Sequence, residues 1–220
     1  MVAQKASIIL PAFNEEKHIG SVIEKINQTG SYEIIVVDDG SRDKTLEVAK
    51  RHGCNCIRLS RNHGKGYASR VGAKIASHDN IVFMDSDEQL DGGEIPKMLS
   101  ALKRCDLAVG SRSMKDIPSQ RIISNNFAKA MLSTAAGKKL NDALCGFRAI
   151  RKNDFFNLNL QKKRYEIEAE MIIKAVRKGL RIKEVPISVR YDIGSQMPVS
   201  DSLRVASYLV GKAFTKSIRI

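Results

Sequence analysis

Residues 6–41 of the sequence, ASIILPAFNEEKHIGSVIEKINQTGSYEIIVVDDGS, contain the pattern that indicates the fold. The β-branched, apolar run at 6–11 ends at a proline and predicts a buried strand. The segment 15–28 is predicted to be a helix with Asn14 as its N-cap, because apolar residues recur at helical spacing: Ile19, Val22, Ile23 and Ile26. A second apolar run at 33–37 stops at Asp-Asp-Gly-Ser. The order strand, helix, strand predicts a βαβ unit of a parallel sheet.

The same alternation continues along most of the chain. Further strands are predicted over 54–59, 80–84, 106–110, 145–150 and 181–189, and further helices over 44–52, 66–77, 94–103, 124–137 and 165–178. The helix at 124–137 is expected to turn Phe127, Met131, Leu132 and Ala135 inward. We predict an α/β fold with a mostly parallel central sheet flanked by helices. One domain is expected over 1–198, with halves 1–110 and 111–198, followed by a basic amphipathic helix at 199–220.

The charge of the chain is unevenly distributed. Its 220 residues carry 37 Lys and Arg against 24 Asp and Glu, which gives a formal net charge of +13. Residues 1–100 have a net charge of −1, and residues 101–220 have a net charge of +14. This excess indicates a polyanionic partner, such as a nucleic acid, an anionic membrane surface or a phosphorylated ligand. Since aromatic residues are few (5%) and no nucleic-acid-binding motif is present, a nucleic-acid-binding module is a distant alternative.

Several sequence features indicate the cellular compartment. No run of 18 apolar residues is present, and the N-terminal residues do not resemble a secretory signal. Four cysteines (Cys54, Cys56, Cys105 and Cys145) are too few and too irregularly spaced for a disulfide framework or a four-cysteine zinc site. We expect a cytoplasmic protein, either free or peripheral on the cytoplasmic face of a membrane.

The acidic triplet Asp85-Ser86-Asp87 directly follows the predicted strand 80–84. Two carboxylates one residue apart can both bind a hard divalent cation such as Mg²⁺ or Mn²⁺, and Gln89 can add a neutral oxygen. Such a triplet also occurs as a simple helix cap, so it is a weak signal when taken alone. The polar clusters that follow the other predicted strands decide how strongly this triplet indicates a cation site.

Three other polar clusters follow predicted strands of the same sheet. Residues 11–16 offer an aromatic ring and carboxylates to a heterocycle, and Asp38-Asp39 can bind sugar hydroxyls or the edge of a base, or simply cap a turn. The Gly-Lys-Gly within 61–66 suits the approach of a phosphate to a helix N-terminus. The sequence contains neither a Walker loop nor a Gly-x-Gly-x-x-Gly motif. Four clusters at one edge indicate a nucleotide-type ligand far more strongly than any one of them.

Together these motifs, in this order, resemble the donor half of family-2 glycosyltransferases with the GT-A fold. The second half resembles the branch of dolichyl-phosphate mannosyltransferases and polyprenyl-phosphate glucosyltransferases, through five segments: Gly110-Ser-Arg112, Arg121–Ser124, Asp142–Arg148, Tyr165–Glu168 and Glu184–Ser188. The likeness extends over about residues 6–196. It implies a GT-A-type nucleotide-sugar-binding fold and inverting, metal-dependent transfer of a hexose from GDP-mannose or UDP-glucose to a polyprenyl phosphate.

The resemblance also implies roles for individual residues. The nucleotide-sugar donor would contact Pro11, Phe13, Glu15, Val37, Asp39, Lys65 and Arg190. The donor diphosphate would be held through Mg²⁺ or Mn²⁺ by Asp85, Ser86 and Asp87, with Gln89 assisting. The acceptor phosphate would contact Arg112, Arg121 and Ser124. Asp142 is the candidate for a base or for a group that positions the acceptor, and an ordinary loop acid is an equally good interpretation.

Two alternatives remain open at this level. A phosphate acceptor is already an anion near neutral pH, whereas a hydroxyl of a glycan, protein or small molecule needs a base. Gly194-Ser195-Gln196 stands where related enzymes often have a Ser-Lys pair, so the sequence is compatible with either kind of acceptor. The C-terminal helix either packs on its own domain or a second subunit, or lies on a membrane through Arg204, Lys212, Lys216 and Arg219. The acids of 165–170 are interpreted as a solvated, partly paired helix face.

Overall fold

The computed structural model describes residues 5–112, 119–137, 139–142, 144–190 and 199–217, with the backbone alone for 119–125, 199 and 214–217. The strands are β1 Ser7–Ala12, β2 Glu33–Asp38, β3 Asn55–Arg58, β4 Asn80–Phe83, β5 Leu107–Arg112, β6 Arg148–Arg151 and β7 Ile182–Ile187. The helices are α1 Ile19–Asn27, α2 Thr45–Arg51, α3 Lys65–Ile75, η1 Gly92–Glu94, α4 Ile95–Ala101, α5 Ser119–Ala136, α6 Lys152–Asn157, α7 Glu166–Arg177 and α8 Val199–Ser217.

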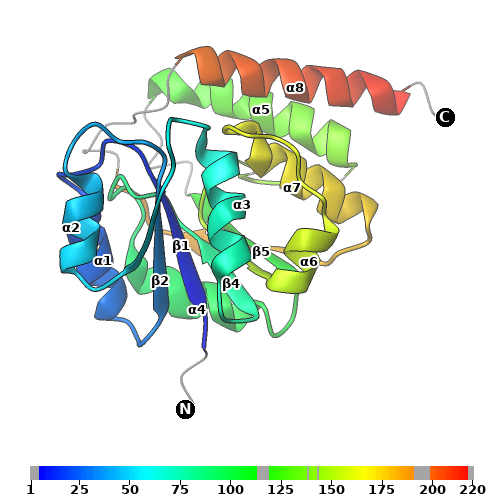
Figure 1. Cartoon of the computed structure of the whole chain (residues 1–220). Coiled ribbons are helices and arrows are strands. Elements are labelled where there is room, and N and C mark those ends of the chain that lie inside the picture. The colour runs from blue at the N-terminus through cyan, green and yellow to red at the C-terminus, as the bar shows by residue number, and fades with distance from the viewer. Residues whose placement is uncertain (1–4, 113–118, 138, 143, 191–198, 218–220) are drawn as a thin grey trace.

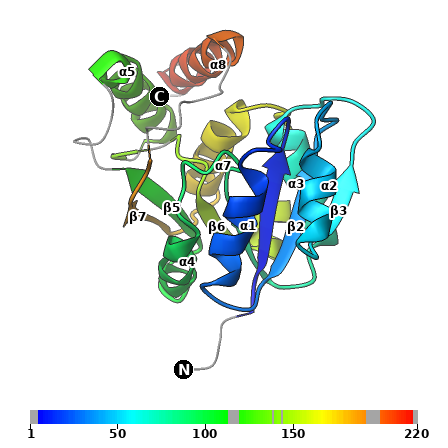
Figure 2. The ribbon, with the colours of Figure 1, turned by 90° about the vertical axis from the view of Figure 1, so that its left-hand side faces the viewer.

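The strands form one sheet in the order β3-β2-β1-β4-β6-β5-β7 (Figures 1 and 2). Neighbouring strands pair in parallel, except that β6 is antiparallel to both β4 and β5. The parallel strands therefore end at one edge of the sheet, and β6 begins at that same edge. This arrangement confirms the predicted α/β fold with a mostly parallel sheet.

The sheet has a hydrophobic core on each face. Along β1, Ile8 and Leu10 point to the face covered by α1 and α4, whereas Ile9 points to the face covered by α3 and α7. Alternate residues of a strand lie on opposite faces, so a strand buried on both sides is a continuous apolar run. The apolar residues predicted to form the buried face of the first helix are all fully buried: Ile19, Val22, Ile23 and Ile26.

The first helix begins later than the sequence predicts. It starts at Ile19, and Asn14 is not its N-cap, because Asn14 has a φ of 57° and lies outside the helix. The Asn14 N–H donates to Ser41 Oγ (2.9 Å), and its side-chain oxygen accepts from the Arg42 N–H (2.9 Å). Asn14 therefore joins the loops that follow β1 and β2.

Helices α5 and α8 lie side by side beyond the edge at which the parallel strands end (Figures 1 and 2). Helix α8 buries Val205 and Leu209 in the core that it shares with α7, so it packs on its own domain. In α5, Leu132 and Ala135 are buried as predicted, but Phe127 is 46% exposed, so the inward prediction for it is wrong. Helical spacing alone did not separate the edge of the apolar face from its centre. No helix in the described part of the chain is long and apolar enough to cross a membrane.

Candidate active site

The acidic triplet lies in the loop that leaves β4 at the edge where the parallel strands end. The buried Ser86 hydroxyl donates to the Pro11 carbonyl (2.8 Å), which ties this loop to the end of β1. The N–H of Gln89 donates to Asp87 Oδ1 (3.2 Å) and orients that carboxylate. The hydroxyl of Ser86 thus holds the loop, and Asp85 and Asp87 are the members of the triplet whose charge can bind a cation.

Three carboxylates come together at this point. Burial, with Asp87 and Asp85 nearby, raises the pKa of Glu15 to about 8, and burial together with Asp85 raises the pKa of Asp87 to about 6. One oxygen of Glu15, Oε2, is buried and has no hydrogen-bond partner. Carboxylates that raise one another's pKa in this way form a concentrated negative charge that a divalent cation would neutralise.

The donor set therefore fits a hard divalent cation, but only one that brings further ligands. Among the described residues, no group of three or more His, Cys, Asp or Glu side chains is arranged to hold a metal by itself. A cation bound by Asp85 and Asp87 would need additional oxygens, and a diphosphate supplies them.

Lys65 brings a positive charge to the same place. Its ammonium, at the start of α3, pairs with both Asp85 and Glu168 of α7. Burial, the largest single influence, lowers the pKa of Lys65, but the two carboxylates together raise it well above its ordinary value. The ammonium also lies 5.4 Å from the centre of the Tyr165 ring. Lys65 is therefore charged and is aimed at the acidic loop rather than at solvent.

The segment before β6 closes the site from the second half of the chain. Gly146 lies so close to Asp85 and Lys65 that a Cβ at this position would be 2.7 Å from Lys65 Nζ. The buried Arg148 guanidinium donates to the Cys145 carbonyl (3.0 Å) and to the Glu168 carbonyl. It thereby fixes this segment against α7.

Asp39 organises the glycine loop that leads to Lys65. Its carboxylate is 3% exposed and accepts hydrogen bonds from the N–H groups of His63 (2.8 Å) and Gly64 (2.7 Å). Burial nevertheless raises the pKa of Asp39. Gly64 has a φ of 98°, which favours glycine. The loop before α3 is therefore held by a side chain at the end of β2.

Two other predicted donor contacts differ sharply in exposure. The Phe13 ring is 40% exposed at the end of β1 and can receive a planar base. The Val37 side chain is fully buried, and it faces Gly72 of α3. The Val37 side chain is therefore not available to a ligand at this edge.

A second charged cluster stands at the end of β5. The Arg112 guanidinium binds both oxygens of Asp142, with NH2 2.9 Å from Oδ1, and the Arg112 N–H donates to Oδ2 (3.0 Å). Glu184 accepts from the N–H groups of Asn141 (2.7 Å) and Asp142 (2.8 Å) and so fixes this loop. Helix α5 carries Arg121 and Ser124, whose side chains lie outside the described residues, as do Gly194-Ser195-Gln196.

Arg190 lies beside the acidic loop. Its N–H donates to the Gln89 carbonyl (2.9 Å), and its guanidinium is 3.4 Å from Glu88 Oε1. Glu88 also accepts from Lys25 (2.6 Å) and Ser21 (2.8 Å), and chiefly the Lys25 hydrogen bond lowers the pKa of Glu88 to about 2. Glu88 thus joins α1 and Arg190 to the acidic loop. The sequence gives no signal for this role.

The acids of α7 do not form the solvated face that the sequence predicts. Glu168 and Glu170 are 7% and 3% exposed, and only the i,i+4 pair of Glu170 with Lys174 (2.8 Å) agrees with the prediction. Glu168 contacts Lys65, from 103 positions earlier in the chain. No site role was predicted for Glu168, Tyr165, Gly146 or Arg148, although all lie in segments that carry the family resemblance.

Comparisons with known proteins agree with this geometry. Residues 7–166 match the family model described as glycosyl transferase family 2. An uncharacterized protein of Methanocaldococcus jannaschii is 35% identical over 196 residues, which cover 84% of this chain and 81% of that protein. The chain therefore belongs to glycosyl transferase family 2, and it is a glycosyltransferase.

Two further similarities bear on the reaction. A dolichol-phosphate mannosyltransferase of Pyrococcus furiosus is 33% identical over 199 residues, which cover 84% of this chain and 56% of that protein. Glucosyl-3-phosphoglycerate synthase of Mycobacterium tuberculosis, in complex with Mn²⁺, UDP and glucosyl-3-phosphoglycerate, superposes with a TM-score of 0.78 at 21% identity. That match covers 97% of this chain and 80% of the other, and it confirms the GT-A type of fold.

Proposed function

We propose that this glycosyltransferase moves a hexose, with inversion, from a nucleotide sugar of the GDP-mannose or UDP-glucose class to a polyprenyl phosphate. The observation that carries the proposal is the order of charged groups along one sheet edge. Asp85 and Asp87 follow β4, Gly146 precedes β6, and Arg112 ends β5. Since β6 separates β4 from β5, the ends of β4 and β5 lie about 10 Å apart, with the acids beyond one and the arginine at the other. That separation suits a donor diphosphate at the acids and an acceptor phosphate at the arginine.

The donor side is built for a leaving nucleoside diphosphate. Breaking the anomeric C–O bond leaves negative charge on the diphosphate, and a bound Mg²⁺ or Mn²⁺ supplies the Lewis acidity that stabilises it. Asp85 and Asp87 would hold that cation. Lys65 adds a buried positive charge beside them, and Phe13 offers its exposed ring to the base.

 The acceptor side is built for an anion that needs no base. Arg112 is held by Asp142 through two parallel hydrogen bonds, so its guanidinium is already oriented before any ligand binds. Both oxygens of Asp142 are occupied by this arginine, and the carboxylate is poorly presented to accept a proton from a hydroxyl. A phosphate acceptor is already ionised and does not require that step. The Pyrococcus furiosus relative, named a dolichol-phosphate mannosyltransferase, supports this choice.

The proposal also gives a location. Polyprenyl phosphates lie in membranes, so the protein would act at the cytoplasmic face of a membrane, with α5 and α8 toward it. Phe127 of α5 and Leu203 and Arg204 of α8 are exposed, which supports this orientation.

A panel of nucleotide sugars tests the donor. In the presence of Mn²⁺, we expect GDP-mannose or UDP-glucose to raise the melting temperature of the protein. We expect Asp85→Ala and Asp87→Ala to abolish that rise, and Asp79→Ala, an exposed acid just before the opposite end of β4, to leave it unchanged. If no donor changes the melting temperature, or if all three variants behave alike, the donor site has been misassigned.

A second measurement tests the acceptor. With the donor so identified, transfer to a short polyprenyl phosphate is expected, and Arg112→Gln should reduce it about 100-fold because a charge-assisted phosphate contact is lost. Transfer to a water-soluble hydroxyl acceptor, with none to the polyprenyl phosphate, would show that the acceptor is a hydroxyl.

A further inference from the structure

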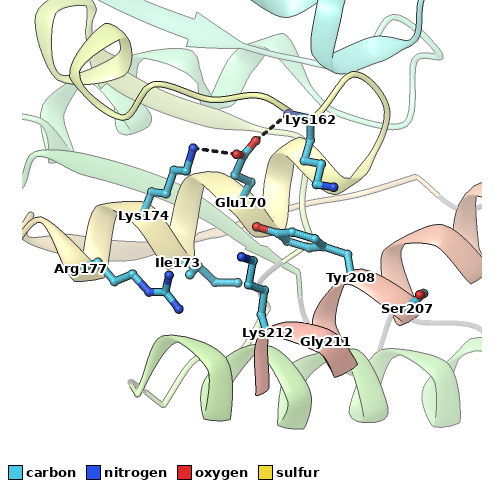
Figure 3. Close-up of a pocket in the computed structure, with 9 residues that line it drawn as sticks. All are labelled: Lys162, Glu170, Ile173, Lys174, Arg177, Ser207, Tyr208, Gly211 and Lys212. Atoms are coloured by element: carbon cyan, nitrogen blue, oxygen red, sulfur yellow. Dashed lines mark hydrogen bonds and ion pairs between the residues drawn. The ribbon is translucent and has the colours of Figure 1, made fainter. Parts of the chain in front are cut away.

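A polar cavity lies between α7, α8 and the segment that precedes α7 (Figure 3). Its volume is about 420 Å³, and its lining includes Lys162, Ile173, Arg177, Tyr208 and Lys212. It is separate from the candidate active site, whose contact with α7 is made by Glu168. No residue given a donor or acceptor role above lines this cavity.

Positive charges gather around one aromatic ring in this cavity. Lys162 Nζ lies 4.8 Å from the centre of the Tyr208 ring, and Lys212 Nζ lies 5.8 Å from it. Figure 3 shows both side chains next to Tyr208, with the Arg177 guanidinium on the same side of α7. Ammonium groups that share one ring repel each other, and an anion between them would remove that repulsion.

The acid in the cavity lining is already neutralised by other groups. Glu170 accepts from the N–H groups of Gln161 (2.9 Å) and Lys162 (2.8 Å), and it pairs with Lys174 (2.8 Å). Figure 3 shows the Lys162 and Lys174 interactions as dashed lines. The lining carries four cationic side chains, Lys162, Lys174, Arg177 and Lys212, and one acidic side chain, Glu170, so its net charge is positive.

We propose that this cavity binds a phosphate-bearing anion with at least two negative charges. Lysine and arginine side chains from three separate segments converge on it, which is the arrangement that a phosphate with several charged oxygens requires. The Tyr208 hydroxyl and Ser207 add neutral hydrogen-bonding groups, and Ile173 supplies an apolar wall for the carbon part of a ligand. The ligand is either a soluble phosphate ester or the headgroup of a phospholipid.

The position of the cavity connects it to the start of α3. The Lys162 carbonyl accepts from Arg70, and the Lys163 carbonyl accepts from the Tyr67 N–H (2.9 Å). An anion bound by Lys162 would therefore stabilise a segment that packs on the loop before Lys65.

Calorimetric titration with inorganic pyrophosphate, in EDTA, tests the site. The EDTA removes divalent cations, so the acids after β4 cannot hold the probe through a metal. We expect Arg177→Gln and Lys212→Gln each to weaken binding about tenfold, because each removes a charge-assisted contact. Lys178→Gln is the matched control: it removes the neighbouring exposed cation, which does not line the cavity, and it should leave the affinity unchanged.

Cosedimentation with phosphatidylcholine vesicles that contain phosphatidic acid distinguishes the two sources of phosphate. Pyrophosphate binding without vesicle binding indicates a soluble ligand, and vesicle binding that both cavity variants weaken indicates a lipid headgroup. The proposal is overturned if the wild-type protein binds neither probe. It is equally overturned if Arg177→Gln and Lys212→Gln bind both probes as Lys178→Gln does.

Discussion

Gly146→Ala tests whether the two halves of the chain meet at the acidic loop. A Cβ at residue 146 would lie 2.7 Å from both Lys65 Nζ and Asp85 Oδ1, and closer still to Asp85 Oδ2. Ordinary van der Waals contact with a Cβ begins near 3.4 Å, so these groups must move by about 0.7 Å or more. The substitution thus displaces the Asp85 carboxylate without removing it.

The size of the effect follows from that displacement. A catalytic group misplaced by about 1 Å costs on the order of 100-fold in rate. We therefore expect kcat/KM for transfer from the identified donor to fall about 100-fold, which corresponds to about 2.7 kcal/mol of lost transition-state stabilisation.

Initial-rate kinetics, with thermal unfolding measured in parallel, provide the assay. The matched control is Gly211→Ala in α8, where an added Cβ meets nothing within 4 Å. The control should keep its kcat/KM and gain about 1 kcal/mol of stability, since alanine is a better helix former than glycine. If Gly146→Ala is as active as Gly211→Ala, Asp85 and Gly146 do not approach each other as described.

Three further substitutions have measurable outcomes. Lys65→Met should lower the free energy of unfolding by about 3 kcal/mol, because it leaves the buried Glu168 carboxylate and the partly exposed Asp85 carboxylate without their shared cation. Mn²⁺ should raise the melting temperature of the variant more than that of the wild type, since Asp85 is released. Equal Mn²⁺ responses would contradict this. Ser86→Ala should lower the free energy of unfolding by about 1 kcal/mol, because the Pro11 carbonyl loses its hydrogen-bond donor. An unchanged midpoint of urea unfolding would show that this hydrogen bond is unimportant. Asp106→Asn should lower the free energy of unfolding by about 1 kcal/mol at pH 7. In the folded state, hydrogen bonds from an arginine side chain and the positive charge of neighbouring arginines lower the pKa of Asp106. That contribution is fully present above the unfolded pKa of about 4 and decreases as the pH falls toward the lowered folded pKa, so the difference in unfolding free energy between the variant and the wild type should narrow between about pH 4 and pH 2. A constant difference down to pH 2 would contradict it.

The strands and helices of the first half could be predicted well from the sequence. Each strand there is a short β-branched run that ends at a polar cluster, and each long helix has its apolar residues at helical spacing. The pairing of β6 between β4 and β5 could not be predicted, because it depends on contacts between segments far apart in the chain. Helix α6 was missed since six residues give too little periodicity to recognise.

The candidate site could likewise be predicted only in part. Asp85 and Asp87 were predictable because both follow one strand, and the edge at which parallel strands end is fixed by the fold. Glu168 was missed because it lies among the acids of 165–170, where the i,i+4 spacing of Glu166/Glu170 and Glu170/Lys174 is typical of a solvated helix face. Its buried carboxylate pairs with Lys65, which comes near it only in the folded chain. Sequence patterns thus identify residues that follow strands more readily than residues whose role depends on a distant partner.

The antiparallel strand β6 has a consequence for how the protein could be divided. Because β6 joins β4 to β5, a fragment ending at residue 110 would leave the apolar edge of β4 without its partner. Such a fragment would also carry Asp85 and Lys65 without Gly146 and Glu168. We expect that fragment to aggregate when expressed alone, and to become soluble when residues 111–220 are produced with it. The two halves of the chain interlock through one sheet, so we expect neither to fold without the other.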